Sequence, residues 1–139
     1  MEMHHKKNNN FILKTLFILS FFLVCSINQD GQPMFILLLI YFIEFFNSFT
    51  YKNFGINWIA VLLPIITMGT LIIFSSYEKY KNGYLMILCF ISLLMVIVSE
   101  TGVLNSNNYK IISYEFIIPL VLFIFSSVSL IIKVFNNKI

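Results

Sequence analysis

Five long runs of apolar residues, separated by short polar segments, constrain this chain more than any other feature of its sequence. The runs cover about residues 11–28, 34–50, 57–76, 84–104 and 111–135. A helix needs roughly 20 mainly apolar residues to cross a hydrocarbon core of about 30 Å. The pattern therefore predicts an all-α membrane protein, folded as a small multi-pass bundle of about five transmembrane helices.

The composition favours the same class of protein. Hydrophobic residues make up 59% of the chain and charged residues 11%, whereas about a quarter of the residues in a soluble domain are charged. All of the basic residues are lysines, scattered along the chain, so no basic face for a nucleic acid is indicated. The expected surroundings are a lipid bilayer, with no nucleic-acid partner.

At 139 residues, the chain has room for a single domain. We expect a polar N-terminal tail over residues 1–10, one helical bundle over 11–135 and a C-terminal tail over 136–139. A signal peptide is the alternative for the first run, but the segment before residue 28 has no A-x-A-like cleavage site, which favours a retained helix. The short polar segment 28–33 predicts that the first two helices form an antiparallel hairpin.

The second run carries a carboxylate, Glu44, near its middle. On a helix, Tyr41, Glu44, Asn47 and Ser48 project within an arc of about 120° and form a polar seam inside the membrane. A carboxylate in hydrocarbon costs about 2.5 to 3.5 kcal/mol on the insertion scale. Glu44 should therefore face protein or water, or be protonated.

The third and fifth runs each contain an interior proline, Pro64 and Pro119, and we treat both as candidate helix hinges. The last run also carries a polar seam, whose candidate site residues are Glu115, Ser126 and Ser129. Serines on such a seam permit close helix packing and interhelical hydrogen bonds.

Two other side-chain types near these runs have simpler expected roles. Glu100 lies near the end of the fourth run and is expected to be a solvated carboxylate at the membrane interface. The two cysteines, Cys25 and Cys89, lie inside apolar runs, where thiols usually act as small packing residues.

The lysines leave the number of crossings open. With five crossings they divide five against four between the two sides, whereas with four crossings, if one of the first three runs fails to cross, they divide seven against two. The second division fits the tendency of positive charge to stay inside. Five crossings remain the expected number, with the N terminus in the cytoplasm; in a bacterium the membrane would be the inner, or plasma, membrane.

No motif in the sequence indicates an enzyme. H-E-x-x-H, G-x-S-x-G and glycine-rich phosphate loops are absent, and the adjacent His4 and His5 have no third ligand nearby. We therefore expect no catalytic residues, no metal site and no cofactor.

Two functions follow from these patterns. The preferred one is a non-enzymatic membrane subunit or accessory protein that makes lateral helix contacts with a membrane-protein partner or within a homo-oligomer. The alternative is a small oligomeric cation- or proton-coupled transporter or channel that uses Glu44, since ionisable groups inside membranes are costly and often functional.

Overall fold

The computed structural model describes residues 2–27, 31–50, 58–76, 82–104 and 113–136, and the side chains of residues 2–10, 49, 59 and 60 lie outside that description. The described residues form five helices and no strand, which confirms the expected all-α fold. The helices are α1 (Glu2–Leu23), α2 (Met34–Thr50), α3 (Trp58–Ser75), α5 (Gly83–Glu100) and α6 (Tyr114–Asn136).

Two helices, α5 and α6, are long and apolar enough to cross a membrane by length and composition. At 1.5 Å per residue, the 23 residues of α6 span about 34 Å and the 17 residues of α2 span about 25 Å. The other apolar helical stretches are shorter: Phe11–Leu23, Met34–Ser48 and Val61–Ser75. The helix lengths therefore suggest association with a membrane, and the five crossings stay a prediction.

Helix α1 begins and ends earlier than the first apolar run. It starts at Glu2, inside the stretch expected to be a polar tail, and stops at Leu23. The chain after Leu23 pairs with the segment before α2, because Ser26 N donates to Gln32 O at 2.8 Å and Met34 N donates to Val24 O at 2.9 Å. This connection is itself part of the packed structure.

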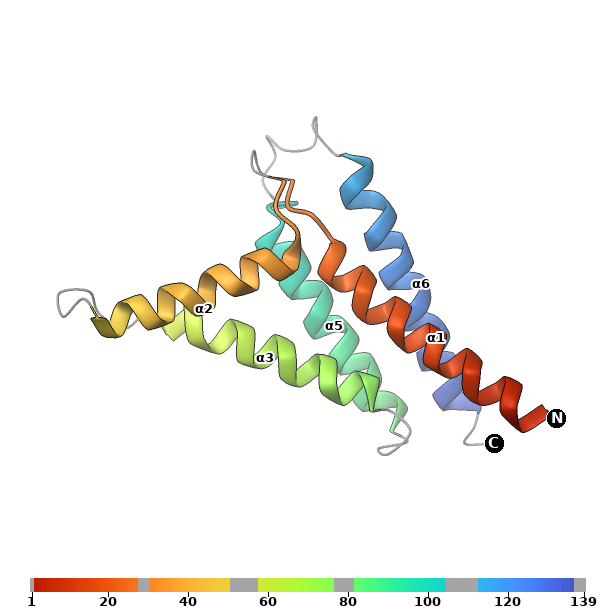
Figure 1. The fold of residues 1–139 in the computed structure, drawn as a ribbon. Helices are drawn as coiled ribbons and strands as arrows, with labels where there is room; N and C mark the ends of the chain where they lie inside the picture. Colours follow the sequence, from red (N-terminus) through yellow and green to blue (C-terminus); the bar gives the residue numbers. More distant parts are fainter. Residues whose placement is uncertain (1, 28–30, 51–57, 77–81, 105–112, 137–139) are drawn as a thin grey trace.

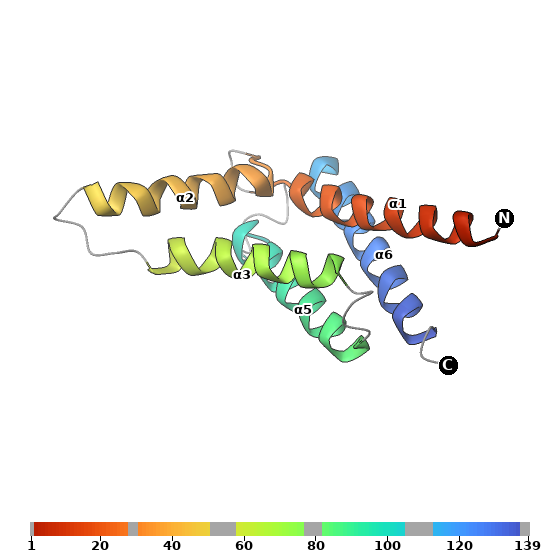
Figure 2. The same ribbon diagram turned by 60° about the horizontal axis from the view of Figure 1, so that its bottom comes forward.

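The first two helices do not form the expected antiparallel hairpin. Helix α2 continues away from the end of α1, so that the two helices lie on opposite sides of their connection (Figures 1 and 2). A backbone bond from Ile27 N to Thr101 O, 2.9 Å long, ties the connection to the end of α5. The connection is short, but its residues pair through backbone hydrogen bonds, and α2 leaves it in a direction away from α1 (Figure 1).

Helix α5 has well-defined ends. At its start, Asn82 is the N-cap and its side-chain oxygen accepts from Tyr84 N at 3.2 Å, which satisfies a backbone donor that the helix leaves open. At its end, Gly102 adopts a positive φ of 72° after the C-cap residue Thr101, a conformation that glycine adopts without strain. Glu100 is therefore the last residue of the helix, four positions before the expected end of the run.

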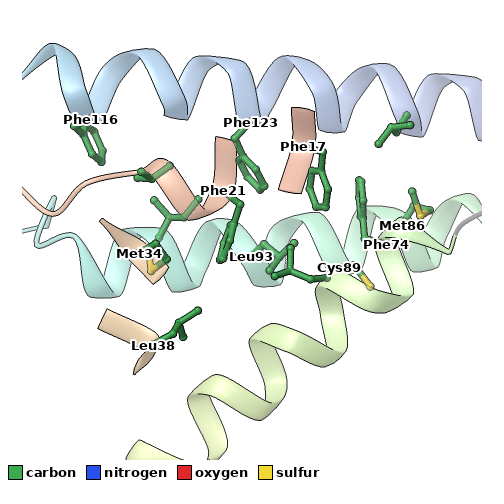
Figure 3. Close-up of a cluster of buried hydrophobic side chains, with 14 of the residues drawn as sticks. Phe17, Phe21, Met34, Leu38, Phe74, Met86, Cys89, Leu93, Phe116 and Phe123 are labelled. Carbon is green, nitrogen blue, oxygen red and sulfur yellow. The ribbon is translucent and has the colours of Figure 1, made fainter. Parts of the chain in front are cut away.

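The core joins all five helices around a group of aromatic rings (Figure 3). Phe17 of α1 stacks on Phe74 of α3 with ring centroids 4.4 Å apart, and on Phe123 of α6 at 5.4 Å. Phe123 also contacts Phe21 at 5.7 Å and Phe90 of α5 at 5.9 Å. Phe123 is thus the ring at which α1, α5 and α6 meet.

Helix α2 contributes only its first turns to this core, through Met34 and Leu38. Helix α1 packs mainly on α6, and α3 packs on α5 and α2. The end of α2 and the beginning of α3 project away from the other helices (Figures 1 and 2). We call residues 42–50 of α2 and 58–66 of α3 the arm.

Candidate functional site

The inner face of α2 is set by apolar residues at helical spacing. Met34 and Leu38 are buried, and Tyr41, Phe45 and Ser48 continue the same line in half-buried positions. Residues three and four apart lie on one face of a helix. This face therefore packs against the rest of the molecule and fixes the direction in which the other side chains of α2 point.

Tyr41 makes the most direct polar contact between two helices that the described residues contain. Its hydroxyl donates to Oε2 of Glu100, the last residue of α5, over 2.6 Å. Glu100 is half-buried, so it is not the freely solvated carboxylate that the sequence indicated. The bond lies close to the point where Ile27 N binds Thr101 O, so α5 ends in contact with both the α1–α2 connection and α2.

The four residues of the predicted α2 seam are divided by the structure. Tyr41 and Ser48 lie on the inner face, and the Ser48 hydroxyl donates to its own helix, at Phe45 O over 2.6 Å. Glu44 and Asn47 are exposed. The Glu44 carboxylate still lies within electrostatic range of the Tyr41 hydroxyl, so two carboxylates, one from α2 and one from α5, act on a single phenol.

On α6, the buried face is rotated from the predicted seam. Ser126 is buried and Ser129 is half-buried, whereas Glu115 is exposed in the first turn. The face packed on the core also includes Ser127 and Phe123. Because large rings fill the contact with α1, the aromatic residues rather than the serines set the inward direction.

The serines of α6 bond within their own helix. Ser126 and Ser127 both donate to Phe123 O, at 3.0 Å and 2.6 Å, and Ser129 donates to Phe125 O at 2.8 Å. Such bonds satisfy the hydroxyls locally and leave a small side chain at the surface of the helix. These serines therefore act here as small packing residues.

Helices α3 and α6 both continue through their prolines, Pro64 and Pro119. Thr67, buried one turn after Pro64, donates its hydroxyl to Leu63 O over 2.7 Å. The carbonyl that a proline leaves without an N–H donor lies four residues before it, so this bond adds to the backbone beside Pro64 and does not replace the missing one. The use of either proline as a hinge stays a hypothesis.

The α1–α2 connection brings a thiol near the first turn of α6. Cys25 is half-buried, and burial, together with the Glu115 carboxylate, raises the pKa of its thiol above the ordinary value. Cys25 and Cys89 are both free thiols, as expected from their apolar surroundings. Glu115 and Glu100 thus both lie at the end of the molecule where this connection packs.

The described residues offer limited means for chemistry. No group of three or more His, Cys, Asp or Glu side chains among them could hold a metal ion; the side chains of His4 and His5 lie outside the description. A cleft of about 50 Å³ between the two helices of the arm is lined by Phe42, Phe45, Val61 and Ile65. Its walls are apolar, so the distinctive polar site is the Tyr41–Glu100 contact with Glu44 beside it.

Comparison with known proteins places the chain in no group. No family model, no curated protein and no solved structure matches it.

Proposed function

We propose that this chain is a multi-pass integral membrane protein that serves as a non-enzymatic subunit or accessory protein through lateral helix contacts. The observation that carries the proposal is the exposure of large apolar side chains on every helix. Examples, one from each helix in chain order, are Leu19 at 55%, Ile43 at 60%, Ile72 at 64%, Leu88 at 65% and Phe125 at 65%. Soluble monomers rarely expose contiguous apolar surface on this scale.

The same exposure supports crossings by all five helices. If only α5 and α6 lay in the bilayer, the exposed apolar side chains of α2 and α3, such as Leu39 at 56% and Ile65 at 59%, would meet water. Each buried side chain of this size gains about 1.5 to 3 kcal/mol on leaving water. Insertion of the arm therefore has a large driving force, and a short helix can be accommodated by local thinning of the bilayer.

Lateral contacts are favoured by the apolar surface of the helices that the structure describes. The described cleft is small and apolar, and the α2–α3 arm projects from the bundle (Figure 1). Helices associate in membranes through close packing and a few polar contacts. An arm that exposes apolar side chains such as Ile43 and Leu62 suits that mode of binding.

The test starts from the tagged chain expressed in its own cells. It should stay in the membrane pellet after alkaline carbonate extraction, and it should co-purify in mild detergent with another membrane protein, or with itself, at a fixed stoichiometry by native mass spectrometry. Release by carbonate would refute membrane integration. A strictly monomeric chain that co-purifies only with lipid would refute the role as a subunit.

A second candidate function is a small oligomeric cation- or proton-coupled transporter or channel. It is favoured by the bond between Tyr41 and Glu100 and by the Glu44 carboxylate, which lies within electrostatic range of the same hydroxyl, because carboxylates and neutral oxygens are the ligands that hard cations prefer. Reconstituted vesicles separate the two functions. Proton or cation flux that is lost in Glu44→Gln, with folding retained, would favour transport, whereas no flux in either protein would favour the subunit.

A further inference from the structure

The outward position of Glu44 follows from packing on the opposite side of α2. Met34 and Leu38 are buried, and Tyr41 is bonded to Glu100 over 2.6 Å, so the rotation of α2 about its axis is fixed at three successive turns. Each step of three residues falls about 60° short of a full turn, so Glu44 lies beside the inner face and Asn47 lies further round the helix. Both side chains are exposed. Helix α2 therefore presents a carboxylate and an amide outward.

In the proposed bilayer, this position is costly for a lone carboxylate. Glu44 lies ten residues after Met34 and six before Thr50, or about 15 Å and 9 Å from the two ends of α2 at 1.5 Å per residue. Exposed Leu39, Ile43 and Phe46 occupy the adjoining outer face. Carboxylates in such surroundings are normally paired or face protein, whereas Glu44 is exposed among the residues that the structure describes.

The chain's own described cations lie elsewhere. Lys14 belongs to α1 and Lys133 to the last turn of α6. The arm projects on the opposite side of the molecule from the N-terminal part of α1 and the C-terminal part of α6 (Figures 1 and 2). Meanwhile Glu100 is bonded to Tyr41, and the Glu44 carboxylate lies within electrostatic range of the Tyr41 hydroxyl. The charge at this end of α2 is therefore negative within the described part of the chain.

A second copy of the chain is a poor cover for this face. In a two-fold symmetric contact the same surface meets itself, so Glu44 would approach the Glu44 of the other copy. Like charges at close range destabilise a contact, most strongly where water is excluded. The complementary surface is one that carries positive charge.

We propose that the outer face of α2, made up of Leu39, Ile43, Glu44, Phe46 and Asn47, docks a transmembrane helix of a different protein that carries a lysine or arginine at the depth of Glu44. This deepens the proposed function, on which it rests, by naming the chemistry of the partner. The apolar side chains supply packing, Asn47 supplies a hydrogen bond and Glu44 supplies the charge that selects the partner. In the low dielectric of the membrane, the ion pair gives specificity to an otherwise generic apolar contact.

The experiment uses photo-crosslinking in intact cells on the full-length tagged chain. p-Benzoyl-phenylalanine replaces Ile43 or Phe46 on the proposed face, and replaces Ile132 of α6, which is 52% exposed, as the matched control. The crosslinked peptide is mapped by mass spectrometry. The expected product joins positions 43 and 46 to an apolar segment of another membrane protein that contains a lysine or arginine.

Charge variants then test the pairing. Glu44→Gln should lower the crosslink yield at position 43 about tenfold, Glu44→Asp should retain most of it, and Glu44→Lys should abolish it. Substitution of the mapped partner lysine or arginine by glutamate should restore crosslinking to Glu44→Lys. Asn136→Gln, at the exposed end of α6, serves as the control and should leave the yield unchanged.

Other outcomes overturn the inference in distinguishable ways. A crosslink from position 43 to a second copy, a crosslink to lipid alone, or a partner segment without a basic residue would each refute the proposed ion pair. If a partner crosslinks from position 132 and not from 43 or 46, the subunit function survives and this docking face is wrong. If no position crosslinks to protein and nothing co-purifies, both the docking face and the subunit function are wrong.

Discussion

Replacement of Tyr41 by phenylalanine tests the hydrogen bond between α2 and the last residue of α5. The substitution removes a hydroxyl that lies 2.6 Å from Glu100 Oε2 and leaves the ring in place. Hydrogen bonds to charged groups contribute about 1.5 to 3 kcal/mol in soluble proteins, while interhelical bonds in membranes average about 0.6 and reach about 1.7 kcal/mol. Because Tyr41 is only half-buried, we expect a loss of about 1 kcal/mol, or about fivefold in the unfolding equilibrium.

The assay is reversible unfolding in mixed micelles by titration with sodium dodecyl sulfate, followed by circular dichroism. Tyr114→Phe makes the same chemical change at a side chain that is 81% exposed and should leave the midpoint unchanged. In a double-mutant cycle, Tyr41→Phe should cost nothing once Glu100→Ala is present. If Tyr41→Phe unfolds like Tyr114→Phe, or if its cost persists in the Glu100→Ala background, the bond does not hold α2.

Two further predictions concern the core and the cysteines. Phe123→Ala should lower the free energy of unfolding by at least about 2 kcal/mol, because it removes the ring that contacts three other aromatic rings. Phe125→Ala, at a side chain that is 65% exposed, should cost little. Equal costs for the two variants would contradict this core. N-ethylmaleimide should label Cys25 and spare buried Cys89 in the folded chain. Glu115→Gln should speed the labelling of Cys25 at pH 8, because removal of the carboxylate lowers the raised pKa of the Cys25 thiol and increases its thiolate fraction. An unchanged or slower rate in Glu115→Gln would contradict that electrostatic link.

The helices could be predicted from the sequence because each is a long apolar run, but several of their ends could not. Helix α5 stops at Glu100, where Gly102 offers a left-handed cap, although the apolar run continues to Leu104. Helix α1 stops at Leu23 because the following residues pair with the segment before α2, and only the fold reveals that pairing. A local capping signal, Gly102, is therefore present at the end of α5, and none is present in the described residues at the end of α1.

The site was predictable to a similar degree. Helical spacing grouped Tyr41, Glu44, Asn47 and Ser48 in one seam, but it could not show that α2 turns Tyr41 and Ser48 inward and leaves Glu44 and Asn47 exposed. The contact between Tyr41 and Glu100 depends on how α2 crosses the end of α5, and periodicity within one helix contains no information about its neighbours. On α6, helical spacing predicted a polar seam that contains Ser126 and Ser129, whereas the large buried ring of Phe123 determines which side of the helix faces the core.

The number of membrane crossings can be decided by the sides on which the two termini lie. Five crossings place the termini on opposite sides, and we expect the N terminus to be the cytoplasmic one. Four crossings place both termini on one side together with seven of the nine lysines. We expect five crossings, because every helix exposes large apolar side chains. A helix outside the bilayer would expose these side chains to water, at a free-energy cost of about 25 cal/mol per Å² of apolar surface.

In a bacterial host, green fluorescent protein fused to the N terminus should fluoresce, and alkaline phosphatase fused to the C terminus should be active, since the first functions in the cytoplasm and the second outside it. The reciprocal fusions serve as controls and should be silent. Fluorescence from both the N-terminal and the C-terminal fusion would instead mean an even number of crossings. The helix to withdraw would then be α2, because its 17 residues span only about 25 Å and include the exposed Glu44, and the docking face inferred for that helix would lie outside the hydrocarbon.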